Sequence, residues 1–342
     1  MVQEHMNKRI GVLGGGSWGT ALAHLLAGKG YPIDWWIFEA DLCRQIAETR
    51  ENTLFLPGVR LSENLHPTND LGCTVRAKEL VLIVVPSHVM RTVSTAMAGH
   101  LEGGATVVSA SKGIENETLL TMSGVIRETL PGLDENRLAV LSGPSFAREV
   151  ALGVPTVVTV AAREPACAQD VQAVFATPAF RVYTNDDVIG VELGGAVKNV
   201  IAIAAGIVDG LGLGLNTRAA LITRGLTEIR RLGRSMGANP RTFTGSAGVG
   251  DLVLTCTGDV SRNHTIGKRI GQGMQLETLL KEMRMVAEGV KTARSVYNLS
   301  LRLGVEMPIS HAVYHILYEN LAPKEAVYQL MTRDLKNELD ED

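Results

Sequence analysis

The sequence has few cysteines and no dense basic segment. Its four cysteines are scattered at positions 43, 73, 167 and 256, without a Cys-x-x-Cys pair. This spacing argues against a disulfide framework or a metal site and suits a reducing cytoplasm. The net charge is −3, and no block of Lys and Arg stands out. We therefore expect neither nucleic acid nor an anionic membrane as a partner, although one or two local cations could hold an anionic small molecule.

Long apolar runs and a leader peptide are missing as well. The first residues, MVQEHMNKR, are polar and lead directly into an apolar segment, which is not the pattern of a secretion signal. The most apolar run, VIAIAAGIV at 200–208, is too short to span a membrane. With 342 residues, of which 45% are hydrophobic, the chain can bury a sizeable core and suits about two domains. We expect a soluble, cytoplasmic, globular protein.

A glycine-rich turn follows the first apolar segment. Residues 8–13 read as a buried strand, Gly14–Gly19 (GGGSWG) as a G-x-G-x-x-G turn, and 20–30 as a helix. The next strand, 33–40, contains Glu39, which lies twenty positions beyond Gly19. In this context the motif predicts a dinucleotide site, with the helix N-terminus facing the phosphates. A glycine-rich turn that binds no nucleotide is the alternative.

Glu39 bears on the choice of cofactor. A carboxylate here accepts hydrogen bonds from ribose hydroxyls, which favours NAD. No arginine lies directly beside it to accept a 2′-phosphate, although Arg44 follows five residues later. The cofactor is therefore NAD or NADP.

The alternation of strands and helices continues through the first half. Each of three further strands ends in small or polar residues, and ligands bind beyond such strand ends in open α/β sheets. Lys112 stands at one of these ends, where it is either a ligand-binding cation or an ordinary solvated lysine. Two more strands extend the first domain to residue 187. The five expected strands are 79–88, 105–113, 138–146, 156–162 and 181–184.

From residue 188 to 342 only helical patterns remain, so we predict an α/β domain followed by an all-helical one. The first helix, 191–209, is apolar on nearly every side but carries Lys198 and Asn199 in its middle. A buried lysine is costly unless it is paired. Either Lys198 extends to the surface and only covers apolar area, or it points into a substrate cavity and handles a proton. The later helices are expected at 217–237, 276–285, 290–303, 310–321 and 324–332.

A segment rich in glycine and small polar residues, 242–273, lies between helices. It contains Asp251, Thr255 and the run Ser261-Arg262-Asn263, which precedes an expected helix at 264–270. Arg262 and Asn263 could bind a phosphate through the planar guanidinium and the helix N-terminal amides. A surface arginine near a loop is the alternative.

Together these stretches resemble the NAD(P)-dependent sn-glycerol-3-phosphate dehydrogenases of the bacterial cytoplasmic type, over essentially the whole chain. The most specific stretch is Gly195-Ala196-Val197-Lys198-Asn199-Val200-Ile201-Ala202, which is similar to the family signature around the catalytic lysine. The others are Gly14–Gly19, Pro86–His88, Ser109–Gly113, Ser142–Ala147, Gly248–Leu252, Ser261–Asn263 and Val286–Gly289. The resemblance implies a Rossmann-type doubly wound domain at 1–187, a helical domain of the 6-phosphogluconate-dehydrogenase-like type at 188–342, and a homodimer.

The fingerprint and the resemblance also imply roles for single residues. The cofactor would contact Gly14, Gly16, Ser17, Trp18, Gly19, Phe38, Glu39, Lys112, Ala147, Arg262, Val286 and Glu288. Glycerol 3-phosphate would contact Lys112, Gly143, Ser145, Lys198, Asp251, Ser261, Arg262 and Asn263. Many relatives carry a basic residue where this chain has Ile37-Phe38, which argues against a strong NADP preference.

These assignments predict a mechanism. Lys198 would exchange a proton with the C2 oxygen of the substrate, Asp251 would orient it, and Asn199 and Thr255 would hydrogen-bond near that oxygen. A charged ammonium already serves as the acid, so we expect reduction of dihydroxyacetone phosphate to dominate at neutral pH and to supply phospholipid synthesis. Three alternatives remain: another two-domain hydroxyacid dehydrogenase, a dinucleotide sensor without chemistry, and a methyltransferase.

Overall fold

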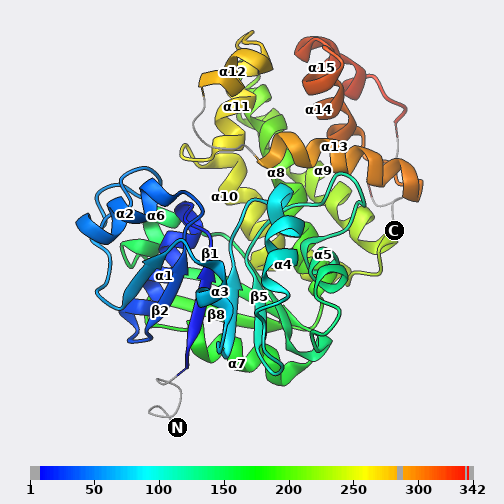
Figure 1. The fold of residues 1–342 in the computed structure, drawn as a ribbon. Coiled ribbons are helices and arrows are strands. Elements are labelled where there is room, and N and C mark those ends of the chain that lie inside the picture. Colours follow the sequence, from blue (N-terminus) through cyan, green and yellow to red (C-terminus); the bar gives the residue numbers. More distant parts are fainter. Residues whose placement is uncertain (1–7, 283–287, 336, 339–342) are drawn as a thin grey trace. The chain divides into compact units, whose positions relative to one another are not determined.

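The computed structural model describes residues 8–282, 288–335, 337 and 338 (Figure 1). Contacts divide the chain into two compact units: Met1–Ser111 with Met122–Val188, and Lys112–Thr121 with Ile189–Asp342. The first unit contains a sheet with helices, and the second contains helices. The predicted fold class, an α/β domain followed by a helical one, is confirmed.

The first unit is built on one eight-stranded sheet with the strand order β3-β2-β1-β4-β5-β6-β7-β8. Neighbours are parallel from β3 to β6, β7 runs antiparallel to β6, and β8 is parallel to β7. All residues of β1, β4 and β5 are buried, as expected for parallel strands covered on both faces. The strands are β1 (Ile10–Leu13), β2 (Ile33–Trp36), β3 (Leu65–Thr68), β4 (Leu80–Ile83), β5 (Thr106–Ser109), β6 (Leu138–Ser142), β7 (Thr156–Ala162) and β8 (Phe180–Asn185).

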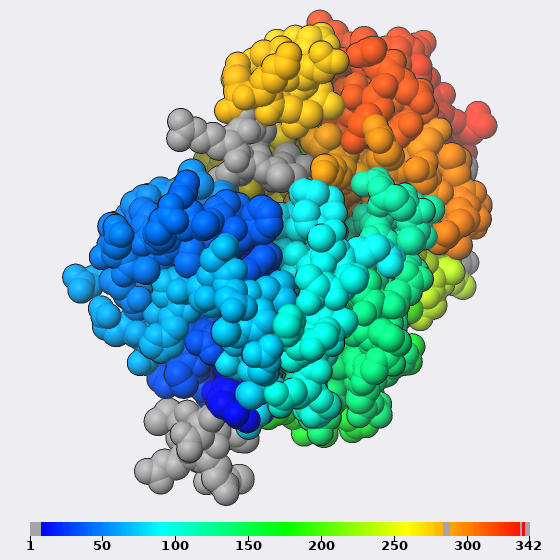
Figure 2. All heavy atoms as spheres, viewed as in Figure 1, coloured from blue at the N-terminus to red at the C-terminus, as the bar shows by residue number. Residues whose placement is uncertain are grey.

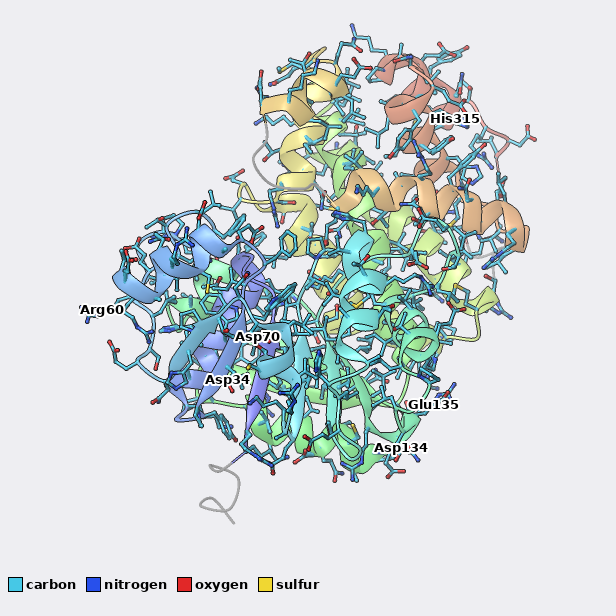
Figure 3. All side chains as sticks on the ribbon, in the orientation of Figure 1. Asp34, Arg60, Asp70, Asp134, Glu135 and His315 are labelled. Carbon is cyan, nitrogen blue, oxygen red and sulfur yellow. The ribbon has the colours of Figure 1, made fainter. Side chains whose placement is uncertain are left out.

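The helices of this unit form two groups that pack among themselves. One group is α1 with α6 and α7, and the other is α3 with α4 and α5, as expected when helices cover both faces of a sheet. Asp70, labelled in Figure 3, caps α3 by accepting a hydrogen bond from the Cys73 amide. The helices are α1 (Ser17–Gly28), α2 (Ala40–Thr49), α3 (Leu71–Val75), α4 (Met90–Met97), α5 (Met122–Thr129), α6 (Ala147–Ala151) and α7 (Pro165–Phe175).

The strand β3 and the helices α2 and α3 were not anticipated from the sequence. The sequence of β3 is LHPT, in which only Leu65 is buried. Pro67 cannot donate a backbone hydrogen bond, and it is tolerated because β3 is an edge strand. Neither an apolar run nor a clean alternation marks such a strand in the sequence.

The second unit is organised around α8 (Val188–Gly210), in which every residue from Gly190 to Val208 is buried. The remaining α-helices are α9 (Gly214–Ser235), α10 (Asp251–Thr257), α11 (Arg262–Gly271), α12 (Leu276–Glu282), α13 (Glu288–Leu303), α14 (Pro308–Tyr318) and α15 (Pro323–Met331). A single π-turn, Ser246–Gly250, leads into α10. No helical turn was expected in this part of the segment 242–273, because its glycines and small polar residues lack an apolar stripe.

The expectation about membrane-spanning length was wrong for α8. The helix has 23 residues and a mean hydropathy of 1.6 over an 18-residue window, so by length and composition alone it could cross a membrane. However, 89% of that window is buried inside the protein, as in the core helix of a globular unit.

One segment differs from the expected domain boundary. Residues Lys112–Thr121 belong to the helical unit, although they lie well before residue 188 in the sequence. Ser295 Oγ on α13 donates to the Ile114 carbonyl (2.8 Å) and to Asn116 Oδ1 (2.9 Å), which holds this segment against α13. Helix α5 accordingly begins only after this segment, at Met122.

Glycines bring α8 and α11 into backbone contact. A Cβ added to Gly206 would lie 2.0 Å from the His264 carbonyl oxygen, and one added to Gly267 would lie 2.0 Å from the Ile203 oxygen. Gly210 and Gly271 repeat this pattern one turn further along each helix. The position of α11 on α8 is therefore fixed by contacts between backbone atoms.

Candidate active site

Two lysines and one aspartate meet in the second unit. Lys198 Nζ on α8 lies 2.5 Å from Asp251 Oδ1, and Lys112 Nζ lies 2.7 Å from Asp251 Oδ2. Asp251 is 1% exposed, and both lysines are largely shielded from solvent. One carboxylate thus bridges two ammonium groups, leaving the cluster with an excess of one positive charge. Such a cluster attracts an anionic ligand.

Burial controls the pKa of Lys198. It lowers this pKa to about 8, because removal from water disfavours the ammonium form. Asp251 acts in the opposite direction, whereas the positive charge of Lys112 lowers the pKa further. An amine with this pKa can give and take a proton near neutral pH, which suits a general acid or base. The neighbouring thiol of Cys256 does not compete, since burial raises its pKa to about 12.

Helix α10 supplies the third hydrogen-bonding partner of Lys198. Thr255 lies one turn after Asp251, so both side chains are on the same face of α10. Its Oγ accepts from Lys198 Nζ (2.8 Å) and donates to the Asp251 backbone carbonyl (2.6 Å). The direction of each bond is therefore determined, and the ammonium of Lys198 is held by two oxygens.

A chain of amides links α8 to α11 and α13. Asn263 Nδ2 donates to Asn199 Oδ1 (2.9 Å), and the Gly289 amide donates to Asn263 Oδ1 (3.1 Å). The Gly289 contact fixes which end of the Asn263 amide is oxygen, and thereby also the orientation of Asn199. Both asparagines are buried, and Asn199 directly follows Lys198 in the sequence.

The N-terminus of α11 carries the expected phosphate-binding run. Ser261 caps the helix by accepting from the His264 amide (3.3 Å), and the exposed Arg262 is the first helical residue. Behind them His264 Nε2 lies 2.8 Å from Asp209 Oδ2, an oxygen that also pairs with Arg218 (2.8 Å). This Asp209–His264–Arg218 network could not be predicted from the sequence, because its members come from three helices.

The glycine loop of the first unit fits a dinucleotide. Gly14 adopts φ +126°, where only glycine is comfortable, and a Cβ on Gly19 would lie 2.2 Å from the Gly14 oxygen. A Cβ on Gly16 would meet no atom within 4 Å, so this side of the loop is open. Within the described part of the chain no side chain caps α1, and its first turn contains no acidic residue. An uncapped helix N-terminus beside open space suits a diphosphate.

Two aromatic side chains, one in this loop and one after β2, are among the predicted cofactor residues. Trp18 Nε1 is buried and has no hydrogen-bond partner among the described residues. Phe38 is 74% exposed, and Glu39 follows it as the N-cap of α2. Arg44 pairs with Asp41. It is therefore already engaged by a carboxylate.

The remaining predicted residues are spread over both units. Gly143 (φ +145°) accepts a hydrogen bond from Ser145 Oγ (3.0 Å) at the end of β6, and Ala147 begins α6. These three belong to the first unit, whereas Glu288, the first residue of α13, belongs to the second. Val286 lies outside the described residues. The structure brings together Lys112, Lys198, Asp251 and Thr255, and separately Asn199 with Asn263.

Comparisons with known proteins point in one direction. The model of the NAD-dependent glycerol-3-phosphate dehydrogenase N-terminus matches residues 9–168, and that of the C-terminus matches residues 187–328. The chain is similar to a glycerol-3-phosphate dehydrogenase (NAD(P)+) from Syntrophobacter fumaroxidans, with 58% identity over 97% of each chain. It is 59% identical to one from Geobacter sulfurreducens, over 97% of this chain and 99% of that protein. A crystal structure of glycerol-3-phosphate dehydrogenase from Coxiella burnetii has a TM-score of 0.92 at 40% identity, covering 96% of this chain and 100% of that one.

Proposed function

The chain belongs to the NAD-dependent glycerol-3-phosphate dehydrogenase family and interconverts dihydroxyacetone phosphate and sn-glycerol 3-phosphate with NAD or NADP, and we propose that Lys198 exchanges the proton of this reaction. The observation that carries the proposal is the buried lysine pair around Asp251, with the pKa of Lys198 lowered to about 8. A buried amine with such a pKa is rare outside functional sites.

Lys198 acts through its ammonium form when the ketone is reduced. The ketone oxygen becomes an alkoxide as the carbon is reduced, and Lys198 Nζ gives it a proton. Asp251 and Thr255 orient Nζ, since both bind it directly. Lys112 adds positive charge that stabilises the developing alkoxide. Asn199, held by Asn263, supplies a further polar group beside Lys198 on α8.

The phosphate of the substrate binds at the start of α11. Arg262 offers a planar fork of donors, and the helix N-terminus adds backbone amides and a partial positive charge. Ser261 and Asn263 flank the arginine on both sides. The close packing of α11 on α8 ties this phosphate site to Lys198 within the same unit. We place Gly143 and Ser145 of the first unit in the substrate site by resemblance.

The cofactor is held mainly by the first unit. Gly14, Gly16, Ser17, Trp18 and Gly19 form its diphosphate loop. A bound nicotinamide dinucleotide supplies the hydride. The other residues that we assign to the cofactor are Phe38, Glu39, Lys112, Ala147, Arg262, Val286 and Glu288.

The experiment is a coupled assay of purified protein with dihydroxyacetone phosphate and either NADH or NADPH. We expect turnover with at least one cofactor, and a preference for NADH because Glu39 repels a 2′-phosphate. Dihydroxyacetone without the phosphate is the matched control, and its KM should be at least 100-fold higher. Turnover with neither cofactor contradicts the function. Equal KM values for the two ketones contradict the phosphate site.

We further propose a cytoplasmic homodimer whose product feeds glycerophospholipid synthesis. The resemblance supports each part, and the scattered cysteines, all free in the structure, suit a reducing compartment. Light scattering coupled to size exclusion should give twice the mass of 36.6 kDa. A monomer at micromolar concentration contradicts the dimer.

A further inference from the structure

Asn52 is a fully buried polar residue outside the sites described so far. It lies in the segment that follows α2, and its side chain is 0% exposed although α2 and its surroundings form the blue outer face in Figure 2. Its Nδ2 donates to the Gly15 carbonyl (2.8 Å) and to Thr20 Oγ1 (2.9 Å). Its Oδ1 accepts from the Phe55 amide (3.0 Å). Both donors and one acceptor lone pair of the amide are used, so the orientation of the side chain is determined.

Two more side chains bind the same loop from behind. Trp35 Nε1 on β2 donates to the Gly14 carbonyl (2.9 Å), and Thr20 Oγ1 on α1 donates to the Gly16 carbonyl (2.8 Å). With Asn52, side chains bind all three consecutive carbonyls of Gly14, Gly15 and Gly16, and Thr20 Oγ1 also lies 3.3 Å from the Gly15 oxygen. These donors come from β2, from α1 and from the segment after α2.

The planarity of the peptide bond determines where the N–H groups of the glycine loop point. The carbonyl of one residue and the N–H of the next are fixed in one plane and point in opposite directions. Because the Gly14, Gly15 and Gly16 carbonyls are drawn inward, the N–H groups of Gly15, Gly16 and Ser17 point outward. None of these three N–H groups donates to an acceptor in the described chain. Successive outward amides form a concave anion-binding site.

We propose that Asn52 is a positioning residue for the dinucleotide, because it holds the Gly15–Gly16 peptide in the orientation that offers the Gly16 N–H to the diphosphate. Glycine has no side chain to restrain its peptide planes, so a Gly-Gly-Gly run needs such external contacts to stay in one conformation. Asn52 binds both the loop and Thr20, and Thr20 binds the loop in turn. Asn52 and Thr20 are thus bonded to each other as well as to the loop, and no hydrogen bond joins Trp35 to either of them among the described residues.

The test uses two variants of Asn52 and a matched control. Asn52→Leu keeps the approximate shape but removes all hydrogen bonds, and Asn52→Asp places an acceptor against the Gly15 oxygen. The control is Asn64→Asp, since Asn64 Nδ2 donates to the Ala27 carbonyl (3.1 Å) at the other end of α1. The dissociation constants of NADH and of ADP-ribose are measured by fluorescence and calorimetry, well below the unfolding temperature of each variant.

We expect both Asn52 variants to weaken NADH and ADP-ribose about tenfold and by the same factor, because the diphosphate is common to both ligands. Asn64→Asp should stay within twofold of wild type. The KM for dihydroxyacetone phosphate at saturating NADH should also stay within twofold. A lower unfolding temperature with unchanged NADH affinity would overturn the proposal, since Asn52 would then serve folding alone.

A second variant keeps the proposal testable if the Asn52 variants do not fold. Thr20→Val is isosteric and removes only the hydroxyl that links Asn52 to the Gly16 carbonyl, so we expect a threefold to fivefold loss of NADH affinity. In the double variant with Asn52→Leu the losses should not add, because both act on one loop. Additive losses, or none for Thr20→Val, count against the proposal. The inference rests on the dinucleotide binding at this loop, and the wild-type protein tests that separately: absence of NADH binding there refutes the cofactor site itself.

Discussion

The two units hold their functional groups in opposite ways. In the glycine loop of the first unit the functional groups are backbone amides, and the side chains of Asn52, Thr20 and Trp35 fix them from behind. In the second unit the functional groups are side chains, and contacts between backbones fix them. A Cβ on Gly194 would lie 2.4 Å from the Ala247 oxygen, so α8 rests directly on the π-turn that precedes Asp251.

This difference shows that glycine serves two purposes in one chain. In the loop, Gly14 supplies a positive φ and Gly16 leaves space for a ligand. In α8, Gly206 has no side chain, so α11 can approach closely, together with the N-terminus of α11 that we propose as the phosphate site. A change in the loop should therefore affect cofactor binding first. A change on α8 should affect stability and the substrate.

The largest expected effect is that of Lys198→Ala. Loss of the proton donor should lower kcat by about 10²- to 10⁴-fold, the range typical of general acid–base groups. The affinity for NADH should stay within twofold, because the loop amides belong to the other unit. Lys268→Ala is the control, since Lys268 is an exposed lysine on α11. Steady-state kinetics and NADH titration provide the readouts.

Two results would break this part of the comparison. A loss of kcat below tenfold would mean that Lys198 only covers apolar surface. A loss of NADH affinity as large as the loss of kcat would mean that Lys198 itself also holds the dinucleotide.

The next largest effect concerns the α8 glycines. The Cβ of Gly206→Ala would lie 2.0 Å from the His264 oxygen and 2.7 Å from the Lys268 nitrogen, both backbone atoms that cannot rotate away. We expect a loss of about 3 kcal/mol or more in the free energy of unfolding. Gly28→Ala is the control, because its Cβ meets no atom within 4 Å and alanine favours the helix by up to about 1 kcal/mol. Thermal and denaturant unfolding measure both.

Gly16→Ala tests a glycine of the loop, where we expect an effect on NADH binding and not on stability. Gly16 has φ −70° and open space around its Cβ, so the variant should keep wild-type stability. It should nevertheless bind NADH more weakly, since the methyl group occupies the open side of the loop. If Gly16→Ala unfolded as readily as Gly206→Ala, the two kinds of glycine would not differ as argued.

A smaller effect is expected at the start of α11. Arg262→Ala should raise the KM for dihydroxyacetone phosphate about 10- to 100-fold, as expected for loss of hydrogen bonds to a charged group. Arg262→Lys should recover part of the loss, because lysine keeps the charge but not the planar fork. Arg269→Ala is the matched control at the other end of α11, where Arg269 pairs with Glu282 (2.7 Å). Equal KM values for the Arg262 and Arg269 variants would remove Arg262 from the phosphate site.

The same contrast explains what the sequence could predict. The glycine loop is local: strand, turn, helix and Glu39 lie within 32 residues, so spacing alone indicates a dinucleotide site. The position of Lys198 in an apolar helix marked it as a candidate functional lysine, whereas Asp251 as its orienting partner was expected only with the family resemblance. Lys112 and Asp251 reach it only because residues 112–121 pack on α13 and a π-turn precedes α10. Neither the segment 112–121 nor the π-turn shows a periodic pattern of apolar residues in the sequence.

Asn52 was not found for a related reason. It is a single asparagine in an irregular segment, and the role that we propose for it depends on hydrogen bonds to Gly15 in the loop and to Thr20 on α1, both more than 30 residues earlier in the sequence. The edge strand β3 was missed because its proline and histidine hide the strand pattern. Long-range polar contacts and weak edge strands are thus the parts that local sequence patterns do not determine.

The smallest expected effect is the pH dependence of kcat. It distinguishes the two units, because Lys198 of the second unit titrates in this range and the loop amides of the first unit do not. With a pKa of about 8, Lys198 is mostly charged at pH 7 and mostly neutral at pH 9. Reduction needs the charged form, so its kcat should be flat below pH 8 and fall above it. Oxidation of glycerol 3-phosphate needs the neutral form, so its kcat should rise about tenfold from pH 7 to pH 9.

Variants of Lys112 and Asp251 should shift these pH profiles in opposite directions. The positive charge of Lys112 lowers the pKa of Lys198, so Lys112→Gln should move both limbs to higher pH, whereas Asp251→Asn should move them to lower pH. The affinity for NADH should stay constant from pH 7 to pH 9, because backbone amides do not titrate there. An NADH affinity that changes with a midpoint near pH 8 would show that the charge of Lys198 controls dinucleotide binding. The division between a backbone site and a side-chain site would then fail.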